Sequence, residues 1–385
     1  MKGLSRRRRV GTFYDITLVA RKEIRQLWRD KASLTLTFII PVLILVAFGV
    51  TIPSSSSVTA TNVPLQASIC DFDNTTLSHD FTTIIGNSTS LALSFQSDVS
   101  QAKSGVEWGT YQAAIIIYPG FAANLTRRPY PMNVSVTLII DDSQSSIVDI
   151  VETQIANATQ IFLGRLGLQS VPIFSLNEDT LSGKNLSYRS TTAAPVMGIA
   201  LVFGCFDDAA GSMAREREKG TFSRLLLTPI NRFSIFLGKT LASLVLTVVR
   251  TSLLLLILVY SLNVIIAGSL LLVFLIALLI DMTTVALGFA ISSRAKSTRS
   301  VVIAQIAIMI PLIFLTGVLR PPETMPSYAR GFVNAIPYTY ANDAFRRVVN
   351  LGQGIQFIAG DILVLLAATI ILFTIAALAM KRSIV

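Results

Sequence analysis

A short charged run separates two long apolar stretches in the middle of the chain: Glu216-Arg217-Glu218-Lys219-Gly220-Thr221-Phe222. The flanking stretches, 192–213 and 237–260, each reach the roughly 20 residues that an apolar helix needs to cross a membrane. Over the whole chain of 385 residues, the mean hydropathy is +0.63 and only 14% of residues are charged. A soluble protein of this size would expose too much apolar surface, so we predict a polytopic membrane protein.

Six apolar runs have the length of a membrane span: 33–51, 192–213, 237–260, 270–291, 301–318 and 355–380. The predicted fold is an α-helical polytopic membrane protein, in which six transmembrane helices carry an extracellular α/β domain between helices 1 and 2. We expect a cytoplasmic basic segment at 1–31, helix 1 at 32–52, the α/β domain at 53–191, and helices 2–6 at 192–385 with a cytoplasmic loop at 214–239.

Lys and Arg are concentrated in the N-terminal segment, the 214–239 loop, the 292–300 loop and the C-terminal tail, which hold 21 of the 32. The positive-inside rule therefore places both termini in the cytoplasm of a multi-pass protein of the cell membrane. Residues 13–31 alternate apolar and basic positions at helical spacing, which predicts an interfacial helix; a plain polar lead-in is the alternative. The basic run 6–9 indicates contact with anionic lipid headgroups rather than nucleic acid.

The 53–191 segment carries six basic and eleven acidic residues, as expected of an external domain. Strands are predicted at 65–70, 112–118 and 134–140, and a helix over 143–166, from their apolar spacing and their Pro, Gly, Asn and Asp boundaries. The segment also holds six N-x-S/T sequons, which accept sugar only on the exported face. We therefore predict glycosylation at Asn74, Asn87, Asn124, Asn133, Asn157 and Asn185.

Ionisable residues within membrane spans are costly and are therefore functional candidates. Depth estimates from the predicted spans make an Arg250–Asp281 pair possible; otherwise each finds another partner. Asp207 and Asp208 either line a transport path or pair with Arg215 and Arg217, and the second interpretation is favoured.

The order E-x-E-x-G-T, L-L-x-T-P and L-G-K over 216–239 resembles the cytoplasmic loop of type-2 ABC transporter permeases. Later segments are also similar to that family: L-G-F-A-I-S-S at 287–293, P-L-I-F-L-T-G-V at 311–318, P-E-T-M-P at 322–326, and P-Y-T-Y at 337–340 before Arg346. The resemblance covers 14–382. It implies that an ATPase subunit docks at Glu216, Arg217, Glu218, Gly220 and Thr221, whose charged side chains we expect to face that partner.

The resemblance implies the transmembrane subunit of an ATP-driven exporter, not an enzyme. It would pair with a second permease copy and with cytoplasmic ATPase subunits that bind ATP and magnesium, whereas this chain would hold no cofactor or metal. Its substrate would be drug-like, a lipid, a polysaccharide or a small ion. A surface receptor and a lipid-acting membrane enzyme are the alternatives, but the first needs fewer spans and the second needs His or carboxylate clusters. Gly238-Lys239-Thr240 is not a phosphate-binding loop, because position 233 lacks the required glycine.

Overall fold

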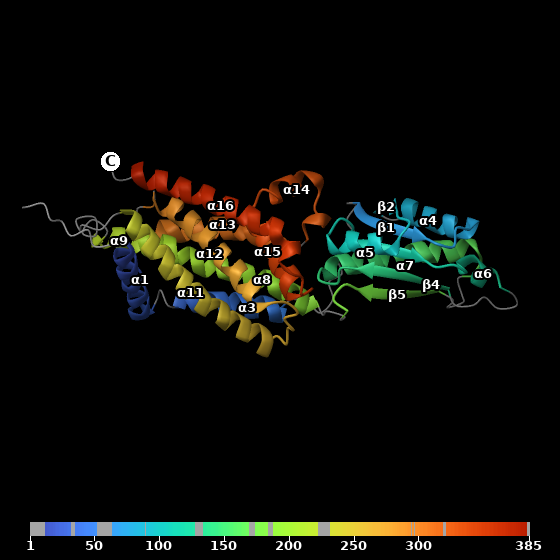
Figure 1. The fold of residues 1–385 in the computed structure, drawn as a ribbon, viewed down its shortest axis with the longest axis horizontal. Helices are drawn as coiled ribbons and strands as arrows, with labels where there is room; N and C mark the ends of the chain where they lie inside the picture. Colours follow the sequence, from blue (N-terminus) through green and yellow to red (C-terminus); the bar gives the residue numbers. More distant parts are fainter. Residues whose placement is uncertain are drawn as a thin grey trace, which may run out of the picture.

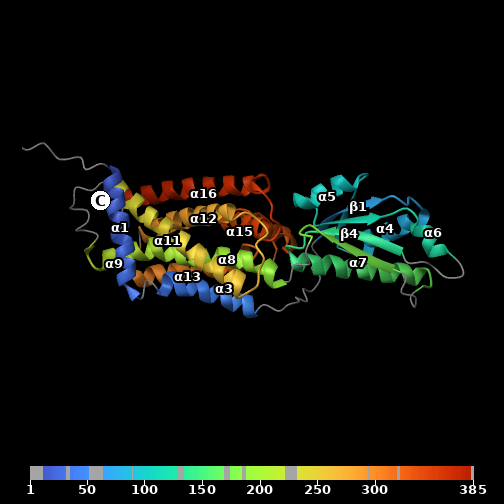
Figure 2. The same cartoon turned by 60° about the horizontal axis from the view of Figure 1, so that its bottom comes forward.

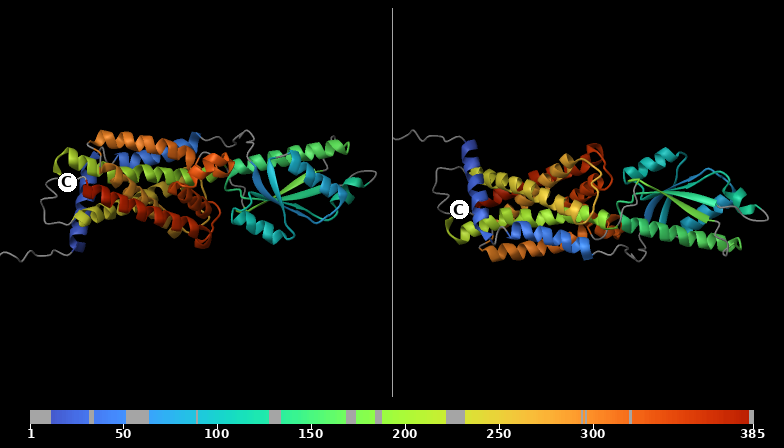
Figure 3. Two further views of the ribbon diagram at one scale, coloured as in Figure 1. Left: turned by 90° about the horizontal axis from the view of Figure 1, so that it is seen from above. Right: turned by 90° about the horizontal axis from the view of Figure 1, so that it is seen from below.

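The computed structural model describes residues 12–31, 35–51, 64–88, 90–127, 134–168, 174–183, 188–221, 232–293, 295, 297–318 and 321–382. These residues form a helical bundle and an α/β domain, which follow one another along one long axis (Figure 1). Helix α1 (Thr12–Arg29) lies crosswise over the far end of the bundle (Figures 2 and 3). We call that end the α1 end, and the end at the α/β domain the sheet end.

Five described helical segments are long and apolar enough to cross a membrane: Thr191–Glu218, Ser234–Tyr260, Leu270–Ser292, Thr298–Leu315 and Ile355–Ala379. They belong to α8 (Tyr188–Phe206) with its continuation, α11 (Arg232–Tyr260), α12 (Leu270–Ser292), α13 (Thr298–Leu315) and α16 (Ile355–Arg382). The first predicted span is a helix of two parts, η1 (Thr35–Ile39) and α3 (Ile40–Thr51), with a shorter apolar section. The described residues thus contain five full-length spans, and the count of six stays a prediction.

One span runs through the centre of the bundle. It consists of α8, the π-helical turn η2 (Asp207–Gly211) and α9 (Ser212–Glu218). In its most apolar window, 89% of the residues are buried, against 17% in α13 and in α16. We call Thr191–Glu218 the central rod; its 28 residues make it about 40 Å long at about 1.5 Å per residue. The rod therefore connects the two ends of the bundle.

Two π-helical turns, η1 and η2, pack against each other near the middle of the bundle. A π turn accommodates an extra residue and disturbs the regular i→i−4 hydrogen bonding of an α-helix. The carbonyl of Thr37, inside η1, accepts a hydrogen bond from Arg250 Nε at 2.9 Å. The irregular backbone of η1 thus contributes a polar partner for a buried charge.

The α/β domain contains a five-stranded mixed sheet in the order β2-β1-β3-β4-β5. The β3–β4 pair is antiparallel and the other three pairs are parallel. Helices α4 and α7 pack on one face with an apolar core that includes Phe81, Ile115 and Phe162, while α5 covers Cys70 and Ile116 on the other face. The elements are β1 (Leu65–Asp71), α4 (Thr76–Ser88), β2 (Leu91–Phe95), α5 (Val99–Glu107), β3 (Ala113–Ile117), α6 (Phe121–Thr126), β4 (Val134–Ile140), α7 (Ser145–Arg165) and β5 (Phe174–Thr180).

Three short elements connect α13 to α16 at the sheet end: η3 (Pro322–Thr324), α14 (Ser327–Val333) and α15 (Pro337–Val349). Pro337 occupies the first turn of α15, where its missing N–H leaves no helical hydrogen bond unmade. Helix α15 packs against α8, α12 and α16. These contacts pack α15 into the bundle, at the sheet end.

Candidate functional site

A buried ionic network fastens three helices together at the α1 end. Lys239 of α11 lies 2.8 Å from Glu23 of α1 and 3.2 Å from Glu216 of α9. Lys22 of α1 forms ion pairs with Glu216 and, at 3.0 Å, with Glu23. Lys239 also donates to Ser212 Oγ at 3.1 Å. Two lysines and two carboxylates therefore hold α1 against the end of the central rod.

The balance of charge in this network keeps Glu23 ionised. Burial opposes ionisation, but the ammonium groups of Lys239 and Lys22 outweigh it and lower the pKa of Glu23 to about 2. The close approach of α1 to α11 depends on Gly238. A Cβ at position 238 would meet Val19 Cβ at 2.6 Å and the Ile16 carbonyl oxygen at 2.8 Å. Helix α1 therefore docks on the L-G-K motif, through Gly238 and the adjacent Lys239.

The expectation that the Glu216 side chain faces a partner is wrong. Glu216 is only 2% exposed and points into the network of Lys22 and Lys239. The cause is tertiary: α1 and α11 approach α9 from positions far away in the sequence and surround that carboxylate. Glu218 is exposed, as expected, and its carboxylate accepts from Thr298 N at 3.3 Å at the start of α13.

The remaining residues of the motif end the rod and position its neighbours. Gly220 has a φ of +67°, a left-handed conformation that favours glycine just past a helix end. Thr221 Oγ1 donates to the Glu216 carbonyl at 3.1 Å. Arg217 donates to the carbonyls of Ser292 and Ser293, at the C-terminal end of α12, at 2.9 and 2.8 Å. The L-L-x-T-P part of the predicted loop lies outside the described residues.

In the middle of the bundle, Arg250 forms its ion pair with Asp208 and not with Asp281. The pair that depth made possible is therefore absent, and each residue has another partner, as the alternative expected. The Arg250 Nη2–Asp208 Oδ2 distance is 2.7 Å, and both side chains are almost completely buried. Asp281 Oδ1 instead lies 2.7 Å from Ser243 Oγ. Span boundaries predict depth along a helix but not the direction of a side chain around it, and direction decides the partner here.

The two aspartates of η2 have different partners. Asp207 forms an ion pair with Arg215 at 3.2 Å, as the favoured interpretation of the sequence expects. The same interpretation also expects Asp208 to pair with one of these two arginines, which is wrong, because Arg217 reaches the end of α12 and Asp208 turns toward Arg250. The two carboxylates therefore belong to different networks, one toward the α1 end and one inside the bundle.

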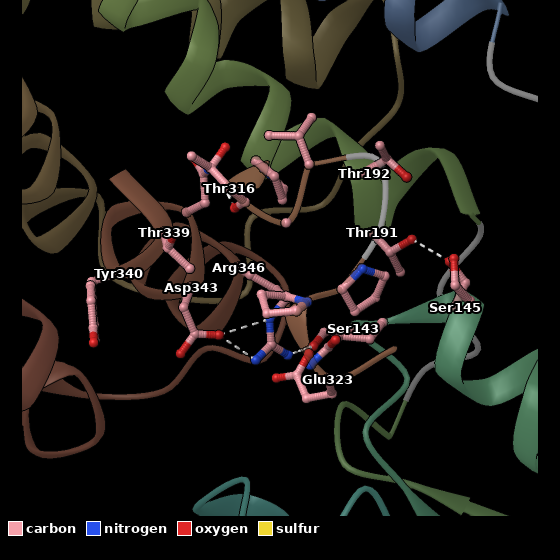
Figure 4. Close-up of a pocket in the computed structure, with 18 of the residues that line it drawn as sticks. Ser143, Ser145, Thr191, Thr192, Thr316, Glu323, Thr339, Tyr340, Asp343 and Arg346 are labelled. Carbon is pink, nitrogen blue, oxygen red and sulfur yellow. Dashed lines mark hydrogen bonds and ion pairs between the residues drawn. The ribbon is translucent and has the colours of Figure 1, made fainter. Parts of the chain in front are cut away.

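A second ionic cluster joins the bundle to the α/β domain at the sheet end (Figure 4). Arg346 of α15 lies 2.6 Å from Asp141, which directly follows β4, and 2.6 Å from Asp343 of its own helix. It also donates to Ser143 Oγ. Partial burial opposes ionisation of Asp343, but Arg346 and Arg347 lower its pKa to about 2. Arg346 thus holds one carboxylate from each part of the molecule.

The P-Y-T-Y motif places this arginine. Tyr338 lies 3.1 Å from the hydroxyl of Thr284 in α12, and so anchors α15 to the bundle. Thr339 and Tyr340 donate to the carbonyls of Val333 and Asn334, which close the turn after α14. Arg346 follows on the same helix. The motif resemblance gives its position but not its partner, because Asp141 lies 205 residues away.

A cavity of about 210 Å³ opens beside this cluster, between the start of α7 and the residues around α15. Its wall includes Ser145, Thr191, Glu323 and Arg346 (Figure 4). Ser145 Oγ of the α/β domain and Thr191 Oγ1 of the central rod are 2.6 Å apart. The bundle forms one wall and the α/β domain another, so the cavity lies at the boundary between the two parts.

The predicted sequon residues lie on the α/β domain where they are described. Asn74, Asn87 and Asn157 are exposed, and Asn124 is half-buried. Asn133 and Asn185 lie outside the described residues. The described positions thus include three side chains on the surface.

The model of the ABC-2 family transporter protein matches residues 31–378 of this chain. The chain belongs to this family. Inner membrane transport permease YhhJ of Escherichia coli (strain K12) is 27% identical over 370 residues, which are 94% of this chain and 96% of that protein. Probable multidrug ABC transporter permease YbhR of the same strain is 23% identical over 341 residues, which are 87% of this chain and 90% of that protein.

An ABC-2 chain can also be part of a larger protein. ABC transporter G family member 20 of Dictyostelium discoideum is 25% identical over 288 residues, which are 74% of this chain but 40% of that protein. Membership makes this ABC-2 chain a multi-pass membrane subunit of an ABC transporter and implies work with an ATPase partner. The bacterial relatives are permeases, in keeping with a transport role rather than catalysis.

Proposed function

We propose that this chain is the permease subunit of an ATP-driven exporter, which pairs with a second permease copy and with cytoplasmic ATPase subunits that bind ATP and magnesium. The observation that supports this most is the central rod. One continuous helix connects the ion-paired α1 end with the α/β domain, so a displacement at one end is carried to the other. Its buried position makes it the helix whose movement most rearranges the bundle.

In this proposal the α1 end is cytoplasmic and the α/β domain is extracellular. The concentration of Lys and Arg in the segments around α1 and α9 supports that orientation. Cysteine introduced at Lys219 should react with an impermeant maleimide only after the membrane is opened, and cysteine at Gln160 from outside. The native Cys70 and Cys205 are buried and should not react with the maleimide. Labelling of position 219 in intact cells would reverse the orientation.

Glycosylation is part of the same proposal. The exposed Asn74, Asn87 and Asn157 are the sites most open to a transferase. In a host that glycosylates, their change to Gln should increase electrophoretic mobility. Unchanged mobility for all three would remove glycosylation from the proposal.

The ATPase is proposed to contact the end of α9, where Glu218, Lys219 and Thr221 are exposed. Glu218→Ala should leave the bundle folded, yet reduce co-purification with the ATPase and substrate-stimulated hydrolysis. Asp80→Ala, an exposed carboxylate of the α/β domain, is the matched control. If Glu218→Ala, Lys219→Ala and Thr221→Ala all bind and stimulate the ATPase normally, this end of α9 is not the contact.

For the substrate, we propose small drug-like molecules, because two of the relatives are named as probable multidrug permeases. Lipids, polysaccharides and small ions are the other classes that the family resemblance leaves. Export of ethidium from cells that express the chain with its ATPase is the direct assay. Accumulation equal to that of cells with an ATPase-dead partner would exclude export of this dye and move the search to lipids.

A further inference from the structure

The carboxylate of Asp281 is buried inside the bundle with too few hydrogen-bond donors. Asp281 lies on α12 and is 0% exposed. Ser243 Oγ lies 2.7 Å from its Oδ1, whereas its Oδ2 has no hydrogen-bond partner among the described residues. A charged carboxylate with one neutral donor is costly in such a place. The surroundings of Asp281 therefore stabilise its ionised form poorly and favour its protonated form.

The cation nearest to this position already has its counter-ion. Arg250 forms a 2.7 Å ion pair with Asp208 and donates further to the Thr37 carbonyl at 2.9 Å and to Cys205 Sγ at 3.0 Å. Asp208 also accepts from Thr37 Oγ1 at 3.2 Å. With Arg250 and Asp208 balanced, an ionised Asp281 would leave the cluster with one unbalanced negative charge.

Other titratable groups near Asp281 do not restore that balance. Asp207 of η2 is paired with Arg215. Cys205 of α8 offers only a weak thiol donor, and the hydroxyl of Tyr338 of α15 lies 3.1 Å from Thr284. Helix α16 faces this part of α12 with the hydroxyl of Thr369, which contacts Thr283. In the part of the chain that the structure describes, no second cation pairs with Asp281.

The position of the Ser243 hydroxyl favours the protonated state of Asp281 over the ionised state. It lies 2.7 Å from Asp281 Oδ1 and 3.4 Å from Asp208 Oδ2, and a hydroxyl has one proton to donate. Two ionised carboxylates would compete for that proton. If Asp281 is protonated, it donates to Ser243, and Ser243 donates to Asp208. Each hydrogen bond in the row from Asp281 to Arg250 then has a donor and an acceptor, and the net charge is zero.

We propose that Asp281 is a proton-binding site, occupied in this conformation, and that it exchanges its proton through Ser243 and Asp208 toward the α1 end. A cavity of about 30 Å³ supports this route. Its wall includes Asp208, Ser243, Lys239 and Glu23, so it extends from the cluster to the ionic network of α1. A space of this size holds about one water molecule, which is enough for a proton relay.

Infrared spectroscopy of the purified full-length chain in lipid nanodiscs tests the occupancy at neutral pH. The wild type should show a carbonyl stretch of a protonated carboxylic acid that D281N lacks. The result that overturns the proposal is a D281N spectrum that loses ionised-carboxylate intensity instead. A protonated band that disappears when Na⁺ replaces a large organic cation in the buffer would also overturn it, since the site would then bind a metal cation.

Thermal unfolding gives an independent reading. D281N resembles the protonated acid and should keep the unfolding midpoint, whereas D208N leaves Arg250 without its counter-ion and should lower the midpoint by several degrees. Equal losses in both variants would show that Asp281 is a second counter-ion and overturn the proposal. Should D208N fail to fold, the infrared comparison of wild type and D281N decides alone.

The route has its own test. After transfer to D2O, the Asp281 carbonyl band shifts as its proton is replaced, and the rate of that shift measures access. S243A should slow the exchange several-fold. As a control, T283A removes a nearby hydroxyl of α12 that contacts Thr369 instead of Asp281. Exchange in S243A at the wild-type rate would overturn the proposed path through Ser243.

Discussion

The ionic clusters at the two ends of the bundle differ in burial. At the α1 end, Glu216 and Lys239 are each 2% exposed in their side chains, and only Lys22, at the rim of the cluster, is substantially exposed, at 38%. At the sheet end, Arg346 and Asp343 are 10% and 32% exposed and lie beside a cavity. Removal of one partner from a buried ion pair leaves the other charge uncompensated. At an exposed pair, water can replace the lost partner. The attachment at the α1 end is therefore the firm one, and the attachment of the α/β domain at the sheet end is the one that can separate.

The chemistry of the cations fits this difference. Each lysine at the α1 end is a compact charge that two carboxylates share, so α1, α9 and α11 meet at one point. The guanidinium of Arg346 is a flat fork that reaches two carboxylates in different directions, one of them in the α/β domain. The first arrangement ties helices of one bundle, and the second bridges two separately packed cores.

The largest expected effect comes from the firm end. Glu216→Gln removes a carboxylate from two lysines, one of them almost fully buried, and should destabilise the bundle by about 3 kcal/mol. Equilibrium unfolding in mixed micelles measures the loss. Glu218→Gln, two residues along and exposed, is the control and should change little. Equal stability of the two variants would contradict the difference in burial on which the comparison is based.

The sheet end should show a smaller effect of another kind. Arg346→Ala removes charged hydrogen bonds to Asp141, Asp343 and Ser143, with an expected loss of about 2 kcal/mol in the attachment of the α/β domain. Trp108 reports on this attachment, because its ring centroid lies 4.7 Å from that of Phe357 in α16. In a Trp28→Phe background, its emission should shift to the red. Arg165→Ala, an exposed arginine of α7, should leave the emission unchanged.

The contact between α1 and α11 offers a milder way to disturb the firm end. Gly238→Ala places a methyl group against Val19 and the Ile16 carbonyl, so α1 has to shift, at a cost of about 1 kcal/mol. Exchange of α1 backbone amides should become faster, while the α/β domain keeps its protection. Gly331→Ala meets nothing within 4 Å and serves as the control. Unchanged exchange in α1 would show that this contact is not tight.

Acid should give the smallest of these effects. The attachment of the α/β domain should weaken only at low pH and change little near neutral pH. The folded-state pKa of Asp343 is about 2, below its ordinary value of 3.8, so its stabilising contribution is complete above pH about 4. That contribution is lost as the pH falls toward 2, and the Trp108 emission should shift over this range. Asp343→Asn should remove the shift between pH 4 and 2. A transition of the same size at pH 6 would exclude Asp343 as its cause.

Much of the α/β domain follows from local pattern. The three strands and the long helix expected from apolar spacing are present as β1, β3, β4 and α7. Strand β5 has no such signal, because Phe174–Thr180 is largely polar and becomes a strand by pairing with β4 at the sheet edge. Buried central strands carry their own apolar signature, whereas an edge strand depends on a neighbour that is distant in sequence.

The sequence by itself determined that this is a polytopic membrane protein of the ABC-2 kind, because span length, charge bias and motif order are properties of the chain alone. Its family motifs also contain Glu216, Lys239 and Arg346, of which only Glu216 was predicted to have a role, as a contact of the ATPase. Only the tertiary structure decided what they contact. Glu216 turns inward to lysines of α1 and α11, Arg250 selects Asp208 over Asp281, and Arg346 reaches Asp141 across the domain boundary. The physical reason is that an ion pair depends on distance and direction in space, and helices meet in a bundle through packing of whole faces that no local spacing encodes.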